Sequence, residues 1–301
     1  MALNAEAVDK PFKKLRKLLK DFPDQPAAED VHDIRTHTRR IEAIVGAFQL
    51  QGKKAGKSLI KDLKPIRKAA GHVRDMDVLT DLAASVEPKG DTACRLKLIH
   101  YLSARRTKLA TKLAKKISAN GHRLRMGLKD CGALAEEDVG QANPVRAKKK
   151  VKRKSGEKAA RSMAFSLQIE KEMRAWPRLN KENIHPFRLK VKELRYTLQL
   201  GEAGDSRLID ALGGVKDQIG LWHDWNELAG VSAHVLDHGA KCPVVTRIRT
   251  CAEEEFQKAI EAADSLRARY LLADTSNRSR KKPAARQIQT ALVEATSRLA
   301  S

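Results

Sequence analysis

The sequence predicts an all-α protein, and three observations carry this prediction. Strand signals, meaning alternating β-branched and aromatic residues, are almost absent from the chain. Apolar residues recur instead at the three- and four-residue spacing of amphipathic helices. A short basic motif also occurs twice, about half a chain apart, and each copy lies on a predicted helix. We therefore expect two pseudo-symmetric four-helix bundles that arose by internal duplication.

The predicted helices fall into two sets, separated by Pro, Gly and Asn residues that end or begin them. In the first half, helices are expected over residues 1–20, 29–51, 53–86, 91–119 and 159–176. In the second half, they are expected over residues 183–200, 205–236, 246–272 and 284–300. The helix expected over residues 91–119 is predicted to end before Asn120 and Gly121, because this pair is typical of a helix C-terminus.

The segment 140–158 differs from the rest of the chain. Asn143 and Pro144 interrupt regular structure, and seven Lys and Arg residues follow between Arg146 and Lys154. Like charges at this density oppose packing, so we expect a mobile basic loop.

The repeated motif places histidine first, arginine three residues later, and arginine or lysine seven residues later. Its copies occupy residues 31–40 and 185–196. At about 100° per residue, positions three, seven and ten residues after the histidine lie within about 80° of it on a helix. The shared stripe contains His32, Arg35 and Arg39 in the first copy, and His185, Arg188, Lys192 and Arg195 in the second.

The opposite side of each motif helix is apolar, with Ile34 and Ile41 in the first copy and Phe187 and Leu194 in the second. Each segment is therefore predicted to have one core face and one basic face. A single charged helix face is usually only solvated. Two copies with the same offsets indicate a site for an extended polyanion.

A second repeated motif follows each copy of the first. Gly71 corresponds to Gly220, and Asp75 corresponds to Asp224. A glycine inside a helix costs about 1 kcal/mol relative to alanine, so its recurrence is interpreted as a close helix approach. The two aspartates are expected to pair with the motif arginines and orient them, although ordinary surface ion pairs would look the same in the sequence.

The composition favours an acidic partner. The chain of 301 residues has 60 Lys and Arg against 37 Asp and Glu, a formal net charge of +23. This excess indicates nucleic acid, anionic lipid or inorganic polyphosphate. No apolar run is long enough to span a bilayer, and no secretory leader is evident, so a cytoplasmic location is expected.

Signatures of catalysis and metal binding are not found. The four cysteines are far apart in the sequence and form no CxxC pair, so we expect no zinc site and four reduced thiols. No Walker motif, His-Glu-x-x-His motif or catalytic triad signature appears. The chain is therefore expected to be non-catalytic and to need no cofactor.

These motifs together resemble those of the CHAD domain, the conserved histidine α-helical domain. The segment His32–Arg40 resembles its first motif, Val73–Leu79 its second, His185–Tyr196 its third and Gly220–Leu228 its fourth. The resemblance extends over about residues 5 to 300. It implies one domain over 1–301, with a first repeat over 1–180 and a second over 181–301.

The resemblance also implies a function: a basic groove or channel along the pseudo-twofold axis binds inorganic polyphosphate and brings the protein to polyphosphate granules. The matched positions are His32, Arg35, Arg39, Arg40, Arg67, Arg74, His185, Arg188, Lys192, Arg195 and Tyr196. Lys64 and Lys216 are added by their place on the helix face.

The chain departs from the family pattern at two positions. Glu42 stands where the second copy has Arg195, and His223 replaces the arginine of an Arg-Asp pair. The two halves are therefore not expected to contribute equally. No Glu-x-Glu-x-Lys triplet, which would indicate an attached triphosphate tunnel domain, is found in the chain.

Three alternatives remain open. Non-specific nucleic-acid binding fits the charge, but aromatic residues make up only 4% and do not interleave with the basic stripes. A metal-dependent polyphosphate or phosphate-ester hydrolase would need carboxylates such as Asp75, Asp77 and Asp224 as metal ligands. Binding to a membrane surface through the N-terminal helix is the third alternative.

Overall fold

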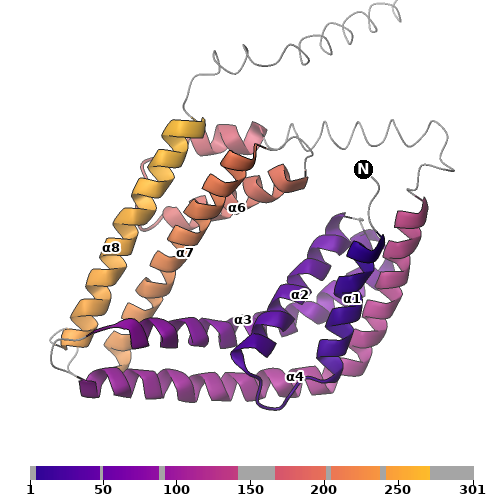
Figure 1. The fold of residues 1–301 in the computed structure, drawn as a ribbon, viewed down its shortest axis with the longest axis horizontal. Helices are drawn as coiled ribbons and strands as arrows, with labels where there is room; N and C mark the ends of the chain where they lie inside the picture. Colours follow the sequence, from indigo (N-terminus) through magenta and orange to yellow (C-terminus); the bar gives the residue numbers. More distant parts are fainter. Residues whose placement is uncertain are drawn as a thin grey trace, which may run out of the picture. The chain divides into compact units, whose positions relative to one another are not determined.

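The computed structural model describes residues 5–47, 50–87, 92–141, 167–200, 205–237 and 242–271 (Figure 1). Within these ranges the regular secondary structure is helical, and no strand occurs in them. The all-α prediction is therefore confirmed. The helix expected at 284–300 and residues 142–158 of the expected basic loop lie outside the described residues.

Four helices build most of the N-terminal half. They are α1 (Ala5–Lys20), α2 (Ala28–Ala47), α3 (Lys54–Ser85) and α4 (Thr92–Gln141), with a short 3₁₀ turn, η1 (Leu50–Gly52), before α3. Asp30 Oδ2 accepts a hydrogen bond from Ala27 N at 2.8 Å, which satisfies a free backbone donor at the start of α2.

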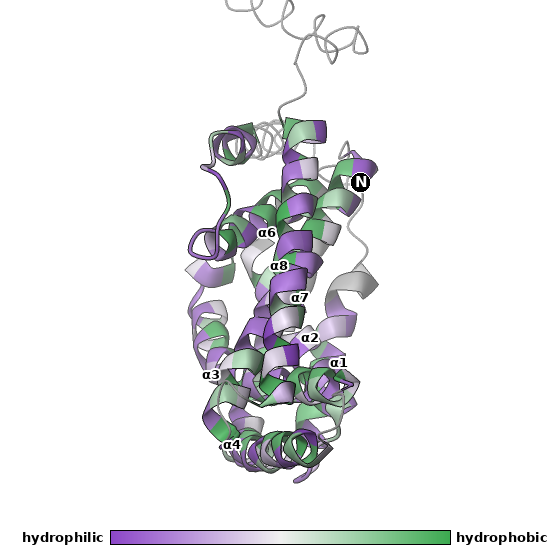
Figure 2. Ribbon diagram, turned by 90° about the vertical axis from the view of Figure 1, so that its left-hand side faces the viewer, coloured by the Kyte–Doolittle hydropathy of each residue, from purple (hydrophilic) through white to green (hydrophobic). Residues whose placement is uncertain are grey.

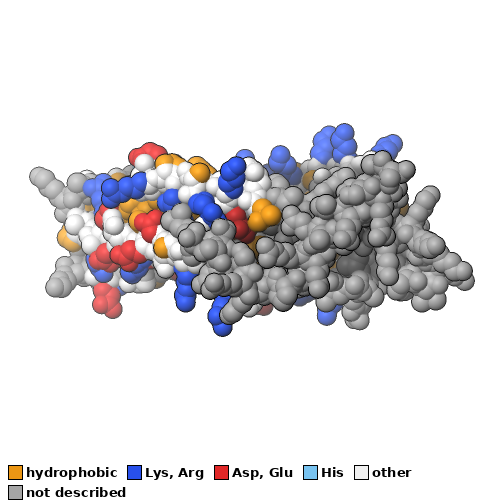
Figure 3. Space-filling model, turned by 90° about the horizontal axis from the view of Figure 1, so that it is seen from above, with side chains coloured by type: hydrophobic (Ala, Val, Ile, Leu, Met, Phe, Trp, Pro, Cys, Tyr) orange, Lys and Arg blue, Asp and Glu red, His pale blue; other side chains and the backbone are white. Residues whose placement is uncertain are grey.

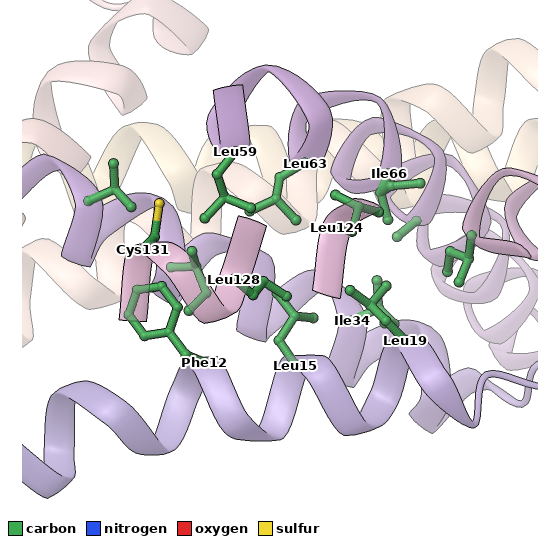
Figure 4. Close-up of a cluster of buried hydrophobic side chains, with 14 of the residues drawn as sticks. Phe12, Leu15, Leu19, Ile34, Leu59, Leu63, Ile66, Leu124, Leu128 and Cys131 are labelled. Carbon is green, nitrogen blue, oxygen red and sulfur yellow. The ribbon is translucent and has the colours of Figure 1, made fainter. Parts of the chain in front are cut away.

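One apolar core joins these four helices. Phe12 and Leu15 of α1 meet Ile34 of α2, Leu63 of α3 and Leu128 of α4, all of them buried (Figure 4). Figure 2 shows hydrophobic and hydrophilic residues on different sides of the helices. Full burial of one such side chain contributes about 1.5–3 kcal/mol, so the core determines which face of each helix points outward.

The prediction that the helix beginning near residue 91 ends at residue 119 is wrong, because α4 continues to Gln141. Asn120 Nδ2 donates a hydrogen bond to Lys116 O at 2.9 Å and so remains on the helix. Ile117, Leu124 and Leu128 continue the helical spacing on both sides of Gly121 and are buried in the core. Tertiary packing therefore overrides the local break signal. Residues 140 and 141, where the basic loop was expected to begin, are also part of α4.

The second half contains a helical stretch over residues 167–174, then α6 (Ile184–Leu200), α7 (Ser206–Val235) and α8 (Pro243–Leu266), which passes into a π-helical turn, η3 (Arg267–Leu271). The bounds predicted for α6 and α7 are within one residue of the observed ones, and α8 begins three residues before the predicted start at 246. Residues 159–166 of the helix predicted over 159–176 lie outside the described residues. Asp205 Oδ1 accepts a hydrogen bond from Arg207 N at 3.0 Å and so caps α7.

The chain forms two compact units, and their boundaries fall inside α7 and α8. Unit 1 comprises the described residues of Met1–Ala160 and Gly220–Phe256, and unit 2 those of Arg161–Ile219 and Gln257–Ser301. The expected repeats, 1–180 and 181–301, are a division by sequence similarity and stay a prediction.

Each unit has apolar packing of its own beyond the core described above. In unit 1, Leu79 of α3, Leu102 of α4, Leu228 of α7 and Ile248 of α8 belong to a second buried cluster. In unit 2, the rings of Trp176 and Phe187 pack edge to face, with centroids 5.6 Å apart. No helix among the described residues is long and apolar enough to cross a membrane.

Two glycines of α3 have different roles. A Cβ added at Gly56 would lie 2.1 Å from Leu50 O, so the backbone of η1 packs directly on this position. A Cβ at Gly71 would have nothing within 4 Å. The interpretation of Gly71 as a point of close helix approach is therefore wrong.

This contrast makes opposite predictions for two alanine substitutions. Gly56→Ala should lower the free energy of unfolding by at least about 2 kcal/mol, because backbone atoms must move. Gly71→Ala should raise it by about 1 kcal/mol, since alanine is the better helix former and meets no neighbour. Urea denaturation followed by circular dichroism measures both. Equal effects of the two substitutions would contradict this placement of η1 on α3.

Candidate functional site

The first motif lies on α2 with its basic residues outward and its apolar residues in the core. Ile34 and Ile41 are fully buried, whereas His32, Arg39 and Arg40 are exposed and Arg35 is partly buried. The two-faced helix is confirmed over Ala28–Ala47, but its predicted end at residue 51 is wrong, because Leu50–Gly52 form the separate 3₁₀ turn η1. His37 lies between Arg35 and Arg39 in the sequence. Its side chain is buried, and its Nδ1 lies 2.8 Å from Asp33 O, so this histidine serves the fold.

Arg35 meets the second motif on α3. Its Nη1 lies 3.6 Å from Asp75 Oδ1, with the two side chains 28% and 42% exposed. Burial and the like charges of Arg39 and Arg74 lower the pKa of Arg35, and Asp75 opposes this effect. The predicted pairing of Asp75 with a motif arginine is confirmed.

The positive charge around Arg35 is only partly compensated. Burial raises the pKa of Asp75 above its usual value, although the charge of Arg35 acts in the opposite direction. Asp224, on the part of α7 that belongs to unit 1, also lies close enough to act on both groups. His223 Nδ1 lies 3.8 Å from Asp224 Oδ1 and also lowers the pKa of Asp75. The second and fourth motifs therefore meet the first in unit 1.

A row of cations on α3 extends the basic face. One side of α3 carries Lys64, Arg67 and Arg74, and Gly71 lies between the two arginines on the same side. Successive members of this set are three or four residues apart. Because Gly71 has no side chain and nothing lies within 4 Å of its Cβ position, open space separates Arg67 from Arg74. An anion could approach the helix there.

Glu42 neutralises one member of this row. Arg67 Nε donates a hydrogen bond to Glu42 Oε1 at 2.8 Å, and the two side chains are 35% and 25% exposed. Glu42 is the residue that replaces the arginine of the second copy. Arg39, Arg40, Lys64 and Arg74 form no ion pair with residues in the part of the chain that the structure describes.

The second copy lies on α6 in unit 2. His185 is exposed, Arg188 and Lys192 are partly buried, and Phe187, Val191 and Leu194 are fully buried. Arg188 Nε donates a hydrogen bond to Lys216 O at 3.0 Å, which joins α6 to α7. Lys216 Nζ lies 2.6 Å from Asp217 Oδ1. The side chain of Tyr196 lies outside what the structure describes.

Arg195 is packed tightly against α7. A Cβ at the buried Gly213 would lie 3.4 Å from Arg195 Nε, within ordinary van der Waals contact, so the guanidinium lies directly over this glycine. Arg195 Nε is buried and has no hydrogen-bond partner among the described residues. At the position that the sequence motif aligns with Arg195, unit 1 has Glu42, which accepts a hydrogen bond from Arg67. The halves therefore differ in charge, as the sequence indicated.

Two further groups of charged residues were not singled out from the sequence. In unit 2, Lys190 Nζ lies 2.8 Å from Glu172 Oε2 and 3.2 Å from Glu193 Oε2, and hydrogen bonds to these carboxylates raise its pKa. In unit 1, α4 carries an outward row of lysines. The sequence feature that could have revealed this row is the absence of Asp and Glu from residues 92–129.

The described residues contain no group of three or more His, Cys, Asp or Glu side chains arranged to hold a metal ion. Asp75 and Asp224 instead have cations as neighbours, which is the environment of an ion-pair partner. The four cysteines are free thiols, and burial raises the pKa of Cys131 to about 11.

The fold and these cationic faces define an all-helical protein with anion-attracting surfaces. The family model of the CHAD domain matches residues 6–233. The chain therefore belongs to the CHAD domain family. No curated protein matches the sequence. The structure is similar to a crystal structure of the CHAD domain from the plant Ricinus communis, with a TM-score of 0.55 and 18% sequence identity over 89% of this chain and 93% of that chain. At this identity the likeness concerns the fold alone.

Proposed function

We propose that the protein binds inorganic polyphosphate, without catalysis, through the motif cations of each unit. The observation that carries this proposal is the grouping of motif cations in unit 1, where Arg35 lies near Arg39 and Arg74, and where Arg39, Arg40 and Arg74 form no ion pair with the described residues. Cations that repel one another in a partly dehydrated place attract an anion strongly, because the anion relieves the repulsion. Membership in the CHAD family supports the same ligand.

The types of residue suit a phosphate polymer. Arginine presents forked donors that match phosphate oxygens, and lysine adds a mobile point charge. On α3, Lys64, Arg67 and Arg74 follow one another at about one or two helical turns, so one chain could contact several of them. Polyphosphate has no bases, so a protein that binds it needs no aromatic side chains for base stacking on its basic faces.

Polyphosphate binding would decide where the protein is found, and the motif arginines would contribute to it in two ways. Binding to polyphosphate would bring the protein to polyphosphate granules. Arg35 and Arg188 are held by Asp75 and by Lys216 O, and so act as oriented donors. Arg39 and Arg40 are exposed and would contribute charge. For the motif cations, nucleic-acid binding and metal-dependent hydrolysis are the competing functions, and the experiments below separate them.

Removal of exposed motif arginines tests the site without disturbing the core. Arg39→Gln with Arg40→Gln should weaken binding of long-chain polyphosphate by at least about tenfold, because each charge-assisted contact is worth about 1.5–3 kcal/mol. Isothermal titration calorimetry near physiological salt measures this loss. Lys10→Gln with Lys20→Gln, on the exposed side of α1, removes the same charge and should have little effect.

The result is interpreted together with competition by duplex DNA and an assay of phosphate release. Equal losses in the two double variants would show that net charge alone drives binding and would contradict the site. Displacement of polyphosphate by an equal concentration of phosphate in DNA would favour the nucleic-acid function. Release of phosphate on addition of Mg²⁺ or Mn²⁺ would favour a hydrolase.

Glu42 is expected to limit the affinity of unit 1. Glu42→Gln removes a negative charge beside Arg67 and keeps the shape of the side chain, so polyphosphate binding should become about three- to tenfold tighter. The loss of an ion pair that is still about one quarter to one third exposed should cost about 1 kcal/mol of stability or less. Glu29→Gln on the same helix is the matched control. Unchanged affinity in both variants would exclude the Arg67 region from the site.

The open space at Gly71 makes a separate prediction. Gly71→Leu places a bulky side chain between Arg67 and Arg74 without a clash at its Cβ. Thermal unfolding should show a fold at least as stable as wild type, and polyphosphate affinity should fall by about tenfold because phosphates can no longer approach the helix. An affinity equal to that of wild type would mean that the ligand does not cross this part of α3.

A further inference from the structure

One long stretch of the chain carries cations and no acids. Residues 92–129 contain eleven Lys and Arg and no Asp or Glu. This stretch forms most of α4, which begins at Thr92. None of these residues belongs to the repeated motifs, and one of them, Arg106, pairs with Asp77 of the second motif, with Nε 2.8 Å from Oδ1.

The packing of α4 sorts these cations onto an outward face. Leu113 and Ile117 are buried in the core of unit 1, and α1 and α3 pack along the helix. Four exposed lysines lie on the other side, at spacings of three and four residues. We call them the α4 lysine row: Lys108, Lys112, Lys115 and Lys116.

The lysine row is not compensated by neighbouring carboxylates. At its two ends, Arg105 Nη1 donates a hydrogen bond to Tyr101 Oη at 3.1 Å, and Arg123 Nη2 lies 3.0 Å from Asp62 Oδ1. The four lysines themselves form no ion pair with any residue in the described ranges. On α8, by contrast, Arg247 Nη1 lies 3.2 Å from Glu254 Oε1. Basic and acidic side chains are also intermingled in the coloured part of the surface that Figure 3 shows.

This arrangement opposes helix stability. Lys108, Lys112 and Lys116 follow one another at four-residue spacing, where like charges destabilise a helix by about 0.2–0.5 kcal/mol per pair. A helix face that served only for solubility would gain from Glu at one of these positions. Residues that break a local rule without a benefit to the fold indicate a function.

We infer that the α4 lysine row binds the sugar-phosphate backbone of duplex nucleic acid, at a surface distinct from the motif cations. From Arg105 to Arg123 the helix rises about 27 Å at about 1.5 Å per residue. A duplex presents one negative charge per about 1.7 Å of its axis, so phosphates are available for every cation of the row. Lysine suits this contact because its point charge needs no fixed geometry.

The residue types on this surface favour duplex nucleic acid over single-stranded nucleic acid. No Phe, Trp or Tyr occurs between residues 105 and 123, so this surface lacks the large aromatic side chains on which single-stranded bases stack. Contacts of the lysine row to backbone phosphates carry no sequence information. Binding without sequence preference follows.

Two other polyanions fit less well. The exposed residues of α4 between 105 and 123 include no large apolar side chain that could enter a lipid headgroup region. The same holds for the N-terminal helix, since Phe12, Leu15 and Leu19 of α1 are buried in the core. A polyphosphate chain would use the motif arginines, whose forked donors the lysine row lacks.

The test uses the full chain with all four lysines of the row changed to Gln. Fluorescence anisotropy with a labelled 20-base-pair DNA should show binding at least about tenfold weaker than for wild type at 100 mM salt. The slope of log K against log salt should become shallower by about 3 to 4, as expected when four phosphate contacts are lost. The variant should fold at least as well as wild type, because like-charge pairs are removed, and thermal unfolding checks this.

The matched control changes Lys10, Lys14, Lys17 and Lys20 of α1, which are also exposed, to Gln. It should leave DNA binding within about threefold of wild type, and an equal loss would overturn the proposal in favour of net charge. Polyphosphate affinity should be retained in the α4 variant, and its loss would assign the row to polyphosphate instead. Loss of binding to phosphatidylserine vesicles with DNA binding intact would assign the row to a membrane.

Discussion

The burial of one apolar face of α2, α3 and α4 in a common core is the constraint on which the arrangement of charge in unit 1 depends. A chain with net charge +23 repels itself, and it folds because residues such as Ile34, Leu63 and Leu128 gain more by burial than their charged neighbours lose. A helix with one face fixed in a core must turn the other face outward. The cations of the motifs and of the α4 lysine row are outward for this reason.

Around Arg35 the same burial has an electrostatic consequence. A partly dehydrated guanidinium near Arg39 and Arg74 is less stable as a charged group than one in water, so its pKa falls. Asp75 compensates part of this cost and holds the side chain in position. What is left is a positive potential that a phosphate chain would satisfy. The fold thus keeps a local electrostatic cost at the place where we propose that it binds its ligand.

The sequence predicted the helices and the orientation of the motif residues well, because both depend on local spacing. Its errors came where distant segments meet. Asn120 and Gly121 signal a helix end, yet burial of Ile117 and Leu124 carries α4 onward to Gln141. Gly71 suggested a close helix contact, yet its surroundings are open, whereas Gly56, which no motif contains, lies against η1. No local pattern shows which backbone will pack on a glycine.

The sequence by itself determined the all-helical fold class, the family, and which residues share a basic face, because helical periodicity converts spacing directly into geometry. Only the tertiary structure decided which of those cations are already engaged. It paired Arg67 with Glu42 and Arg35 with Asp75, placed Arg195 across Gly213, and left the α4 lysine row without a described carboxylate partner. Such pairings join helices that are separate in the sequence, and they depend on how those helices pack.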